Sequence, residues 1–239
     1  MSKIASAART VVSNQEGPHK DLEKQVRRYA AAEYRRPIAE HTREAFTSTE
    51  NFVAAFADRR GSAVNVILDS GCGTGESTLH LARKFPDIPV IGIDKSAVRL
   101  EKAAQFAENK GNTSHDLPRN AFYVRAELID FWRLAMDKVK AGTWNIPYHA
   151  LYYPNPWPKQ SEAGRRFHLH PVFSTLLQLA QETELRTNWE IYAQEFAQAA
   201  SILGYNATVQ QFTPDSPQTA FERKYNEAHQ KLWRVVVKR

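Results

Sequence analysis

The chain has 239 residues, 42% of them hydrophobic, with a formal net charge of +6. This length and apolar fraction favour one globular domain. No stretch approaches the roughly 18 apolar residues of a membrane helix or the continuous apolar segment of a secretory signal. The single cysteine, Cys72, excludes an internal disulfide and is typical of a reducing cytoplasm, and no Cys/His cluster indicates a metal site.

The first part of the chain predicts two helices. Helix-forming residues fill 19–36 up to Pro37, and the apolar stripe of 38–57 predicts a second helix. We therefore divide the chain into an N-terminal basic helical extension, residues 1–60, and a main domain, residues 61–239.

Basic residues are concentrated at both ends of the chain. Eleven Lys or Arg face eight Asp or Glu in residues 1–60, and six face two in residues 221–239. A basic balance favours polyanionic partners such as nucleic acid. These segments are either ordinary solvated surface or two basic edges that flank a cleft.

From residue 64 onward, short β-branched runs alternate with helical segments. The predicted strands and helices, in chain order, are 64–69, helix 76–85, 88–94, helix 96–111, 120–125, helix 127–140 and 147–153. Strands that alternate with helices indicate an α/β fold, with a parallel sheet covered on both faces. Two late strands, 205–212 and 231–238, have no long helix clearly between them, so we expect an antiparallel edge.

The segment ILDSGCGTGEST, residues 67–78, places three glycines between a strand and a helix. They fall at alternate positions, Gly71, Gly73 and Gly75. Glycines there allow a tight turn and let the backbone approach a ligand closely. Asp69 ends the strand before them, and Asp94 ends the next strand, where its carboxylate can accept hydrogen bonds from both ribose hydroxyls. This spacing differs from the G-x-G-x-x-G of dinucleotide enzymes.

The acid-x-G-x-G-x-G pattern resembles motif I of class I S-adenosylmethionine-dependent methyltransferases. The resemblance implies that Asp69 meets the methionine ammonium of that cofactor and that Asp94, with Lys95 beside it, holds the ribose. Glu127 follows the third strand and has two interpretations that remain open. It accepts a hydrogen bond from the adenine amino group, or it is an exposed glutamate favoured by the dipole at the start of a helix.

The segment LYYPNPWPK, residues 151–159, follows the fourth strand and so lies at the same sheet edge as the glycine loop. Its prolines fix the backbone, Asn155 presents an amide from that rigid frame, and Trp157 offers a ring for stacking. Three cations suited to phosphates follow: Lys159, Arg165 and Arg166. The alternative is a proline-rich surface turn with inward-packed aromatics, but the position favours an active-site loop.

Three segments resemble the bacterial tRNA (guanine-N7)-methyltransferases of the TrmB family. YYPNPWPK is similar to the family's F-P-D-P-W-x-K loop, TNWEIY (187–192) to its T-D-W-x-x-Y, and TAFERKY (219–225) to its T-x-F-E-x-R/K. The resemblance runs from about residue 64 to the end of the chain. It implies a Rossmann-like, mostly parallel seven-stranded sheet, S-adenosylmethionine as cofactor and tRNA as substrate.

The resemblance also implies roles for individual residues. Asn155 contacts the cofactor and faces the reacting base, which makes it the candidate catalytic residue. The implied substrate-binding residues are Trp157, Lys159, Arg165, Arg166, Asn188, Thr219, Phe221 and Glu222. Asn155 and Asn188 stand where the family has aspartates, so a negative charge that would stabilise the methylated base is missing. This departure predicts slower turnover or another target base.

Three alternatives remain beside guanine-N7 methylation. An exocyclic-amine methyltransferase uses a [DN]-P-P-[YFW] loop, of which this chain has the asparagine and the aromatic but lacks the second proline. A small-molecule methyltransferase would leave the basic tail without a role. A catalytically weak RNA-binding relative would not need the glycine loop. The sequence does not specify the tRNA, the nucleotide or the oligomeric state.

Overall fold

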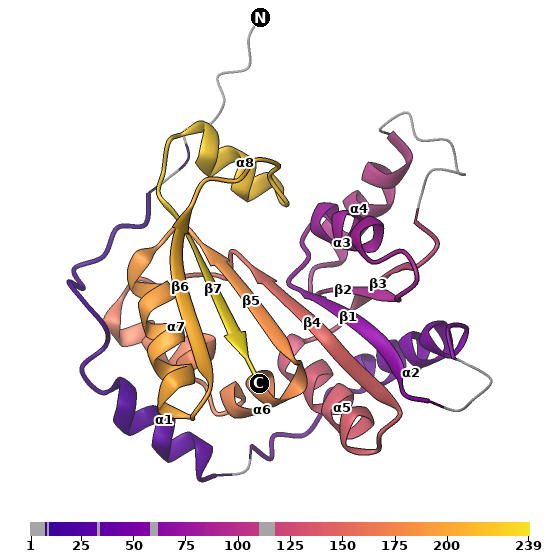
Figure 1. Ribbon diagram of the computed structural model, residues 1–239, viewed down its shortest axis with the longest axis horizontal. Coiled ribbons are helices and arrows are strands. Elements are labelled where there is room, and N and C mark those ends of the chain that lie inside the picture. Colours follow the sequence, from indigo (N-terminus) through magenta and orange to yellow (C-terminus); the bar gives the residue numbers. More distant parts are fainter. Residues whose placement is uncertain (1–7, 9, 33, 58–61, 110–117) are drawn as a thin grey trace, which may run out of the picture.

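The computed structural model describes the chain outside residues 1–7, 9, 33, 58–61 and 110–117. At its centre is one seven-stranded sheet (Figure 1) in the order β3-β2-β1-β4-β5-β7-β6. The strands are β1 Val64–Ser70, β2 Val90–Asp94, β3 Ala121–Arg125, β4 Trp144–Tyr152, β5 Glu182–Thr187, β6 Asn206–Phe212 and β7 Leu232–Lys238. In this sheet β7 alone runs antiparallel to the other strands, so the pairs β5–β7 and β7–β6 are antiparallel and the other pairs are parallel. This arrangement confirms the predicted fold class and the antiparallel edge.

Helices lie on both faces of the sheet (Figure 1). The α-helices are α1 Leu22–Ala30, α2 Glu40–Ala54, α3 Glu76–Lys84, α4 Ala97–Asn109, α5 Leu128–Lys140, α6 Phe173–Leu179, α7 Glu190–Ile202 and α8 Ala220–Glu227. Two short 3-10 helices follow β4: η1 Gln160–Arg165 and η2 Phe167–Leu169. Helices α3 and α4 cover one face, whereas α2, α5 and α7 pack on the other. None of the described helices has the length and apolar character needed to cross a bilayer.

The N-terminal helices share the core of the sheet. Leu22 and Val26 of α1 are buried in the same apolar cluster as α7, and Phe46 of α2 contacts the rings of Phe131 and Trp144 at 5.0 and 5.3 Å between centroids. The division of the chain at residue 60 stays a prediction. Burial of these helices against the sheet makes the N-terminal segment part of the same hydrophobic unit.

Strand β5 was not predicted individually, because its sequence, ETELRT, contains no apolar run. The side chain of Glu184 is buried and pairs with Arg186 at 2.6 Å and with Arg234 of β7 at 2.7 Å. The Arg186 guanidinium also lies 4.7 Å from the Tyr152 ring and 5.2 Å from the Phe212 ring. On this part of the sheet, ion pairs and aromatic rings cover the strand where aliphatic side chains usually would. The sequence of β5 therefore lacks the apolar pattern by which a strand is recognised.

Candidate active site

A cavity of about 370 Å³ lies at the carboxyl ends of β1, β2 and β4. The strand order reverses between β1 and β4, and such switch points are where open α/β sheets bind ligands. The cavity wall comes from the glycine loop, the end of β2, the start of α5 and the loop after β4. Among the lining residues are Ser70, Gly71, Asp94, Lys95, Glu127, Asn155, Trp157 and Arg165. The structure thus brings together residues that lie up to 97 positions apart in the sequence, from Ser70 to Phe167.

The three glycines of the loop have different physical roles. All have positive φ angles, +77° at Gly71, +59° at Gly73 and +80° at Gly75. A methyl group on Gly71 would meet no atom within 4 Å, so this backbone is open to a ligand. At Gly75, the same group would lie 2.6 Å from the Tyr123 ring and 2.8 Å from Ala103, so this glycine allows close packing of the loop.

Asp69 lies beneath the loop and does not line the cavity. Its Oδ2 accepts hydrogen bonds from Ser77 and Thr78, both at 2.6 Å. Burial raises the pKa of Asp69 to about 6, although these two hydroxyl donors oppose the shift. In the described contacts Asp69 joins β1 to α3, and the predicted contact with an ammonium group stays a prediction.

Asp94 is only 3% exposed and borders the cavity. Its Oδ1 accepts the N–H of Ser96 at 2.8 Å, and its Oδ2 accepts the N–H of Gly73 at 3.1 Å and lies 3.6 Å from Arg99. These contacts fix the carboxylate between the end of β2 and the glycine loop. Glu127 immediately precedes α5 and also lines the cavity, with its side chain exposed.

The loop after β4 has a constrained backbone. Tyr153 and Trp157 have positive φ angles of 51° and 46°, which cost side-chain-bearing residues about 1–3 kcal/mol. The Tyr153 hydroxyl donates to Glu222 at 2.9 Å. Asn155 between them is exposed at the cavity wall, and its Oδ1 accepts the N–H of Trp157 at 3.3 Å. The loop therefore presents the Asn155 amide from a strained frame that the rest of the protein must hold.

Arg166 is a buried residue that stabilises the loop after β4. Sequence reasoning placed Arg166 among the substrate-binding cations, but its side chain is 0% exposed. It donates twice to the carbonyl of Trp157, at 2.9 and 3.2 Å, and pairs with Glu195 of α7 at 2.6 Å. Arg166 therefore stabilises the loop from the protein interior and, contrary to the prediction, is not a surface cation that can bind a substrate. Its neighbour Arg165 is exposed.

The buried pair extends to the N-terminal segment. Gln15 accepts from Arg166 at 3.0 Å and donates to Glu195 at 2.6 Å, and His168 lies 2.8 Å from the same carboxylate. Ser13 donates to the carbonyl of Pro158 at 2.8 Å. Sequence reasoning missed Glu195 and Gln15. The only available signal was a single acid, Glu195, within the apolar run of α7.

The segment before and within α8 supports the same loop. Thr219 caps the helix by accepting the N–H of Glu222 at 3.0 Å. Glu222 is 0% exposed and accepts two hydrogen bonds from Arg186, at 3.0 and 3.1 Å. A substrate therefore cannot reach the Glu222 carboxylate in this conformation, which corrects its predicted role. Phe221, in contrast, is 52% exposed and stacks on Tyr225.

The remaining predicted substrate residues lie at or near the surface. Lys159 is exposed, and the Arg165 guanidinium lies 4.6 Å from the centroid of the Trp157 ring. Asn188 is half-buried, and its amide donates to Gln230 at 3.0 Å. Trp157 and Arg165 line the cavity, and Lys159 follows two residues after Trp157. We refer to Lys159, Arg165 and Trp157 together as the cationic and aromatic rim.

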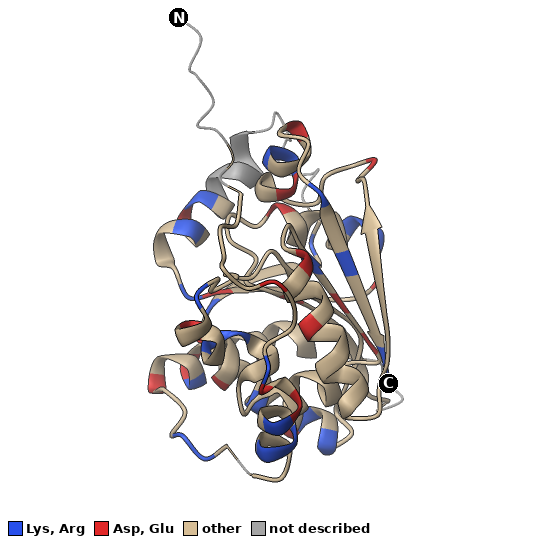
Figure 2. Cartoon of the chain, turned by 90° about the vertical axis from the view of Figure 1, so that its left-hand side faces the viewer, with Lys and Arg blue, Asp and Glu red and all other residues tan. Residues whose placement is uncertain are grey.

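Three cations of the C-terminal segment pair with carboxylates instead of forming an unbroken basic edge. Their pairs are Arg223 with Glu76, Arg234 with Glu184, and Lys238 with Glu182. Figure 2 shows Lys and Arg interspersed with Asp and Glu over one side of the molecule. The net positive charge is thus spread, and the cations that line the cavity are Lys95, Arg99 and Arg165.

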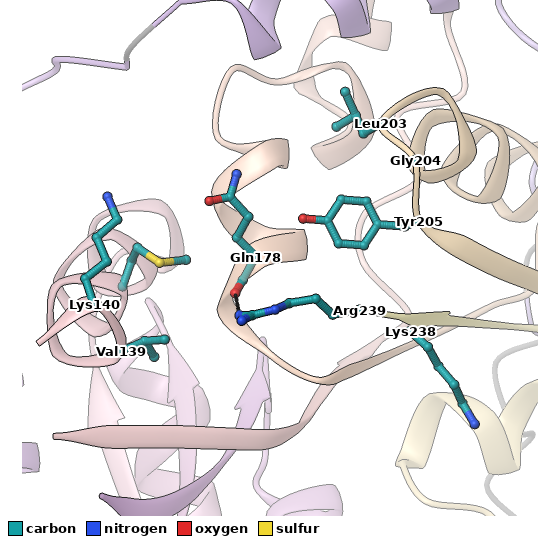
Figure 3. A pocket seen from close by; sticks show the side chains of 9 residues that line it. Val139, Lys140, Gln178, Leu203, Gly204, Tyr205, Lys238 and Arg239 are labelled. Carbon is teal, nitrogen blue, oxygen red and sulfur yellow. Dashed lines mark hydrogen bonds between the residues drawn. The ribbon is translucent and has the colours of Figure 1, made fainter. Parts of the chain in front are cut away.

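A second cavity, of about 490 Å³, lies near the opposite end of the sheet (Figure 3). Lys140, Tyr205 and Arg239 line it, and Arg239 donates to the carbonyl of Gln178 at 3.0 Å. Lys238, also in its wall, lies opposite Glu182 at the start of β5. Its described lining contains no Asp or Glu side chain. The cavity at Asn155 therefore remains the candidate site.

The hydrogen-bond acceptors of the candidate site fit the hydroxyl and amino groups of a nucleoside. The carboxylates of Asp94 and Glu127 can accept from hydroxyl and amino groups, and the open backbone at Gly71 allows close approach. A volume of about 370 Å³ lies in the range of small-molecule sites. Within the described residues, no group of three or more His, Cys, Asp and Glu is arranged to hold a metal ion.

Residues 63–235 match the family Methyltransf_4, described as "Putative methyltransferase". A tRNA (guanine-N(7)-)-methyltransferase of Neisseria meningitidis is 26% identical over 188 residues, covering 76% of this chain and 74% of the relative. An enzyme of the same name from Saccharophagus degradans is 24% identical over 193 residues, 77% of this chain and 79% of the relative. A third, from Cytophaga hutchinsonii, is 32% identical over 101 residues, 42% of this chain and 40% of the relative.

Two solved structures share the fold. "Structure of an Antibiotic Related Methyltransferase" superposes with a TM-score of 0.54 at 15% identity, over 85% of this chain and 96% of that chain. The aminoglycoside resistance methyltransferase NpmB1 gives a TM-score of 0.50 at 18% identity, over 80% and 92% of the two chains. At these identities the likeness establishes the architecture alone.

Proposed function

The chain belongs to the Methyltransf_4 family of methyltransferases, and we propose that it transfers the methyl group of S-adenosylmethionine to guanine N7 of a tRNA. Relatives named for this activity align over about three quarters of the chain. The observation that carries the proposal is the cavity at the sheet's switch point, where Gly71 and Asp94 lie on one side and Asn155 on the other. A tRNA substrate agrees with the cytoplasmic location expected from the sequence.

Each wall of the cavity has a role in cofactor binding. Asp94, held by the N–H groups of Gly73 and Ser96, accepts hydrogen bonds from the ribose hydroxyls. Glu127 accepts from the adenine amino group, and the backbone at Gly71 allows close approach. When bound, S-adenosylmethionine supplies an electrophilic methyl group on a sulfonium.

The reaction at guanine N7 requires positioning more than proton transfer. N7 carries a lone pair and no proton, so its attack on a methyl group needs no general base. Asn155 lies at the cavity wall on a loop held by Arg166 from below, where its amide can orient the base. Because Asn155 is uncharged, it stabilises the positive charge of the methylated base less than a carboxylate would. We therefore expect slow turnover.

Methyl transfer to bulk tRNA, followed by digestion to nucleosides, tests the proposal directly. With labelled S-adenosylmethionine, we expect the label in N7-methylguanosine. Label confined to N6-methyladenosine would support the exocyclic-amine reaction instead, since the amide oxygen of Asn155 can also accept from an amino group. Binding of tRNA without any saturable binding of S-adenosylmethionine would support the non-catalytic alternative.

The exposed rim supplies a first prediction about RNA affinity. Replacing Lys159 and Arg165 together by alanine should weaken tRNA binding by about 10-fold or more at moderate salt. The slope of log K against log salt should also become less steep by about two, because two fewer phosphates are neutralised and fewer counterions are released on binding. Titration of tRNA at several salt concentrations measures both quantities. Lys140→Ala, at the second cavity, is the matched control and should change neither.

A further inference from the structure

Ser70 is a buried hydroxyl at the floor of the candidate cavity that the sequence analysis did not single out. It is the last residue of β1 and precedes the glycine loop. Its side chain is 1% exposed, and it lines the cavity together with Gly71 and Phe167. The side chain of Asp69, the residue before it, faces α3, where it accepts a hydrogen bond from Ser77. Alternation along the strand places Ser70 on the opposite face, toward α5.

Two buried rings contact the Ser70 hydroxyl oxygen. The indole Nε1–H of Trp132 on α5 donates to it at 2.9 Å, and the Nε2 of His149 on β4 lies 2.7 Å away. Both rings are 0% exposed, and burial lowers the pKa of His149 to about 3, so the imidazole is neutral. An indole N–H can only donate, so one lone pair of the serine oxygen is already occupied.

The second nitrogen of His149 decides the direction of the other hydrogen bond. Nδ1 is buried and has no hydrogen-bond partner among the described residues. If Nδ1 carried the proton, a donor would be left buried and unpaired, which is rarer and costlier than an unpaired acceptor. The proton therefore belongs on Nε2, which donates to Ser70. The serine oxygen then accepts twice and its own hydrogen remains available.

We propose that Ser70 donates this hydrogen to the carboxylate of the methionyl part of S-adenosylmethionine, and that Trp132 and His149 position it. The inference rests on the proposed function and assigns one end of the ligand. Across the sheet, Asp94 on β2 is placed at the ribose and Asn155 after β4 at the methyl group, with Ser70 on β1 between them. With the ribose at Asp94 and the methyl group at Asn155, the amino-acid tail of the ligand extends toward Ser70. Its carboxylate is the strongest hydrogen-bond acceptor of that tail.

Two ligands that differ only in the amino-acid tail test the inference by calorimetry. S-adenosylhomocysteine has the carboxylate, whereas 5′-methylthioadenosine keeps the nucleoside and lacks the whole amino acid. Ser70→Ala should weaken S-adenosylhomocysteine binding by about 10- to 100-fold, the size expected for one hydrogen bond to a charged group. Binding of 5′-methylthioadenosine should change less than about 2-fold, because it makes no contact that depends on the serine hydroxyl.

The controls separate this inference from the proposed function. Equal losses for both ligands, or no loss for S-adenosylhomocysteine, would overturn the role of Ser70 while leaving methyl transfer intact. Wild-type protein that binds neither ligand would overturn the inference together with the proposed function. His149→Phe should reduce the S-adenosylhomocysteine affinity less than Ser70→Ala, and the double variant should lose less than the two single effects combined. Additive losses would contradict positioning through His149.

Discussion

Glu195→Gln is expected to lower the free energy of unfolding by about 3–5 kcal/mol, because it leaves the Arg166 guanidinium charged and unpaired in the interior. Arg166 and Glu195 are 0% exposed and lie 2.6 Å apart. In either orientation the glutamine amide would place its N–H groups against other donors. Arg166 and His168 contact Oε2, and the Gln15 amide and the His19 N–H donate to Oε1. Unfolding in urea, followed by tryptophan fluorescence, measures the change.

The pH dependence of stability supplies an independent check on the same pair. Burial opposes ionisation of Glu195, but hydrogen bonds and charge from His168 and Arg166 outweigh it and lower the pKa from 4.5 to about 2. A folded pKa below the unfolded value means that this stabilisation is fully present above about pH 4.5 and is lost as the pH falls toward 2. The Glu195→Gln variant should lose less stability than wild type over that interval.

Glu162→Gln is the matched control, because Glu162 and Arg165 form a more exposed ion pair, 3.3 Å apart, in the same segment. Such pairs contribute about 0–1 kcal/mol, so this variant should unfold close to wild type. A comparable loss in both variants would show that the segment is sensitive to any substitution. Unchanged stability of Glu195→Gln would show that the buried pair does not hold the loop.

The sequence predicted those parts of the fold that have a local signature. β1, β2 and β3 are short, largely apolar runs, and their positions follow closely from that pattern. β4 was predicted from residue 147 but begins at Trp144, because Asn145 and Pro147 interrupt its apolar pattern. Asp94 and Asn155 end or follow buried strands, and parallel topology brings strand ends to one edge, where both line the cavity. For these residues, sequence position and sheet geometry together determine location.

Roles that depend on distant partners could not be predicted. Arg166 and Arg165 are adjacent and chemically identical, yet one is buried against Glu195 and the other is exposed. The sequence around Glu222 predicts a substrate-facing residue, but its carboxylate pairs with Arg186 of β5, which lies 36 positions away in the sequence. No local pattern distinguishes a cation that meets a buried acid 29 residues away from one that meets solvent.

Asp94→Ala is expected to weaken binding of S-adenosylmethionine by about 100-fold or more, because the carboxylate accepts two ribose hydrogen bonds of about 1.5–3 kcal/mol each. Part of the loss comes from the loop itself, since Asp94 also accepts the N–H groups of Gly73 and Ser96. Affinity for tRNA should remain near wild type, because Asp94 is only 3% exposed and the cationic rim lies on another loop. Calorimetry with the cofactor and a tRNA titration measure the two affinities.

The reciprocal pattern is what assigns each part of the site to its ligand. Lys159→Ala with Arg165→Ala should leave cofactor affinity unchanged while tRNA affinity falls, the opposite of the Asp94 result. Arg99→Ala is the control for loss of the cation beside Asp94. The Arg99 guanidinium is largely exposed and lies 3.6 Å from Asp94, so removing it should lower the cofactor affinity by less than about 10-fold. If Asp94→Ala weakened both ligands equally, the cofactor and RNA sites would not be separable as proposed, and the loop at Gly73 would be the common support that failed.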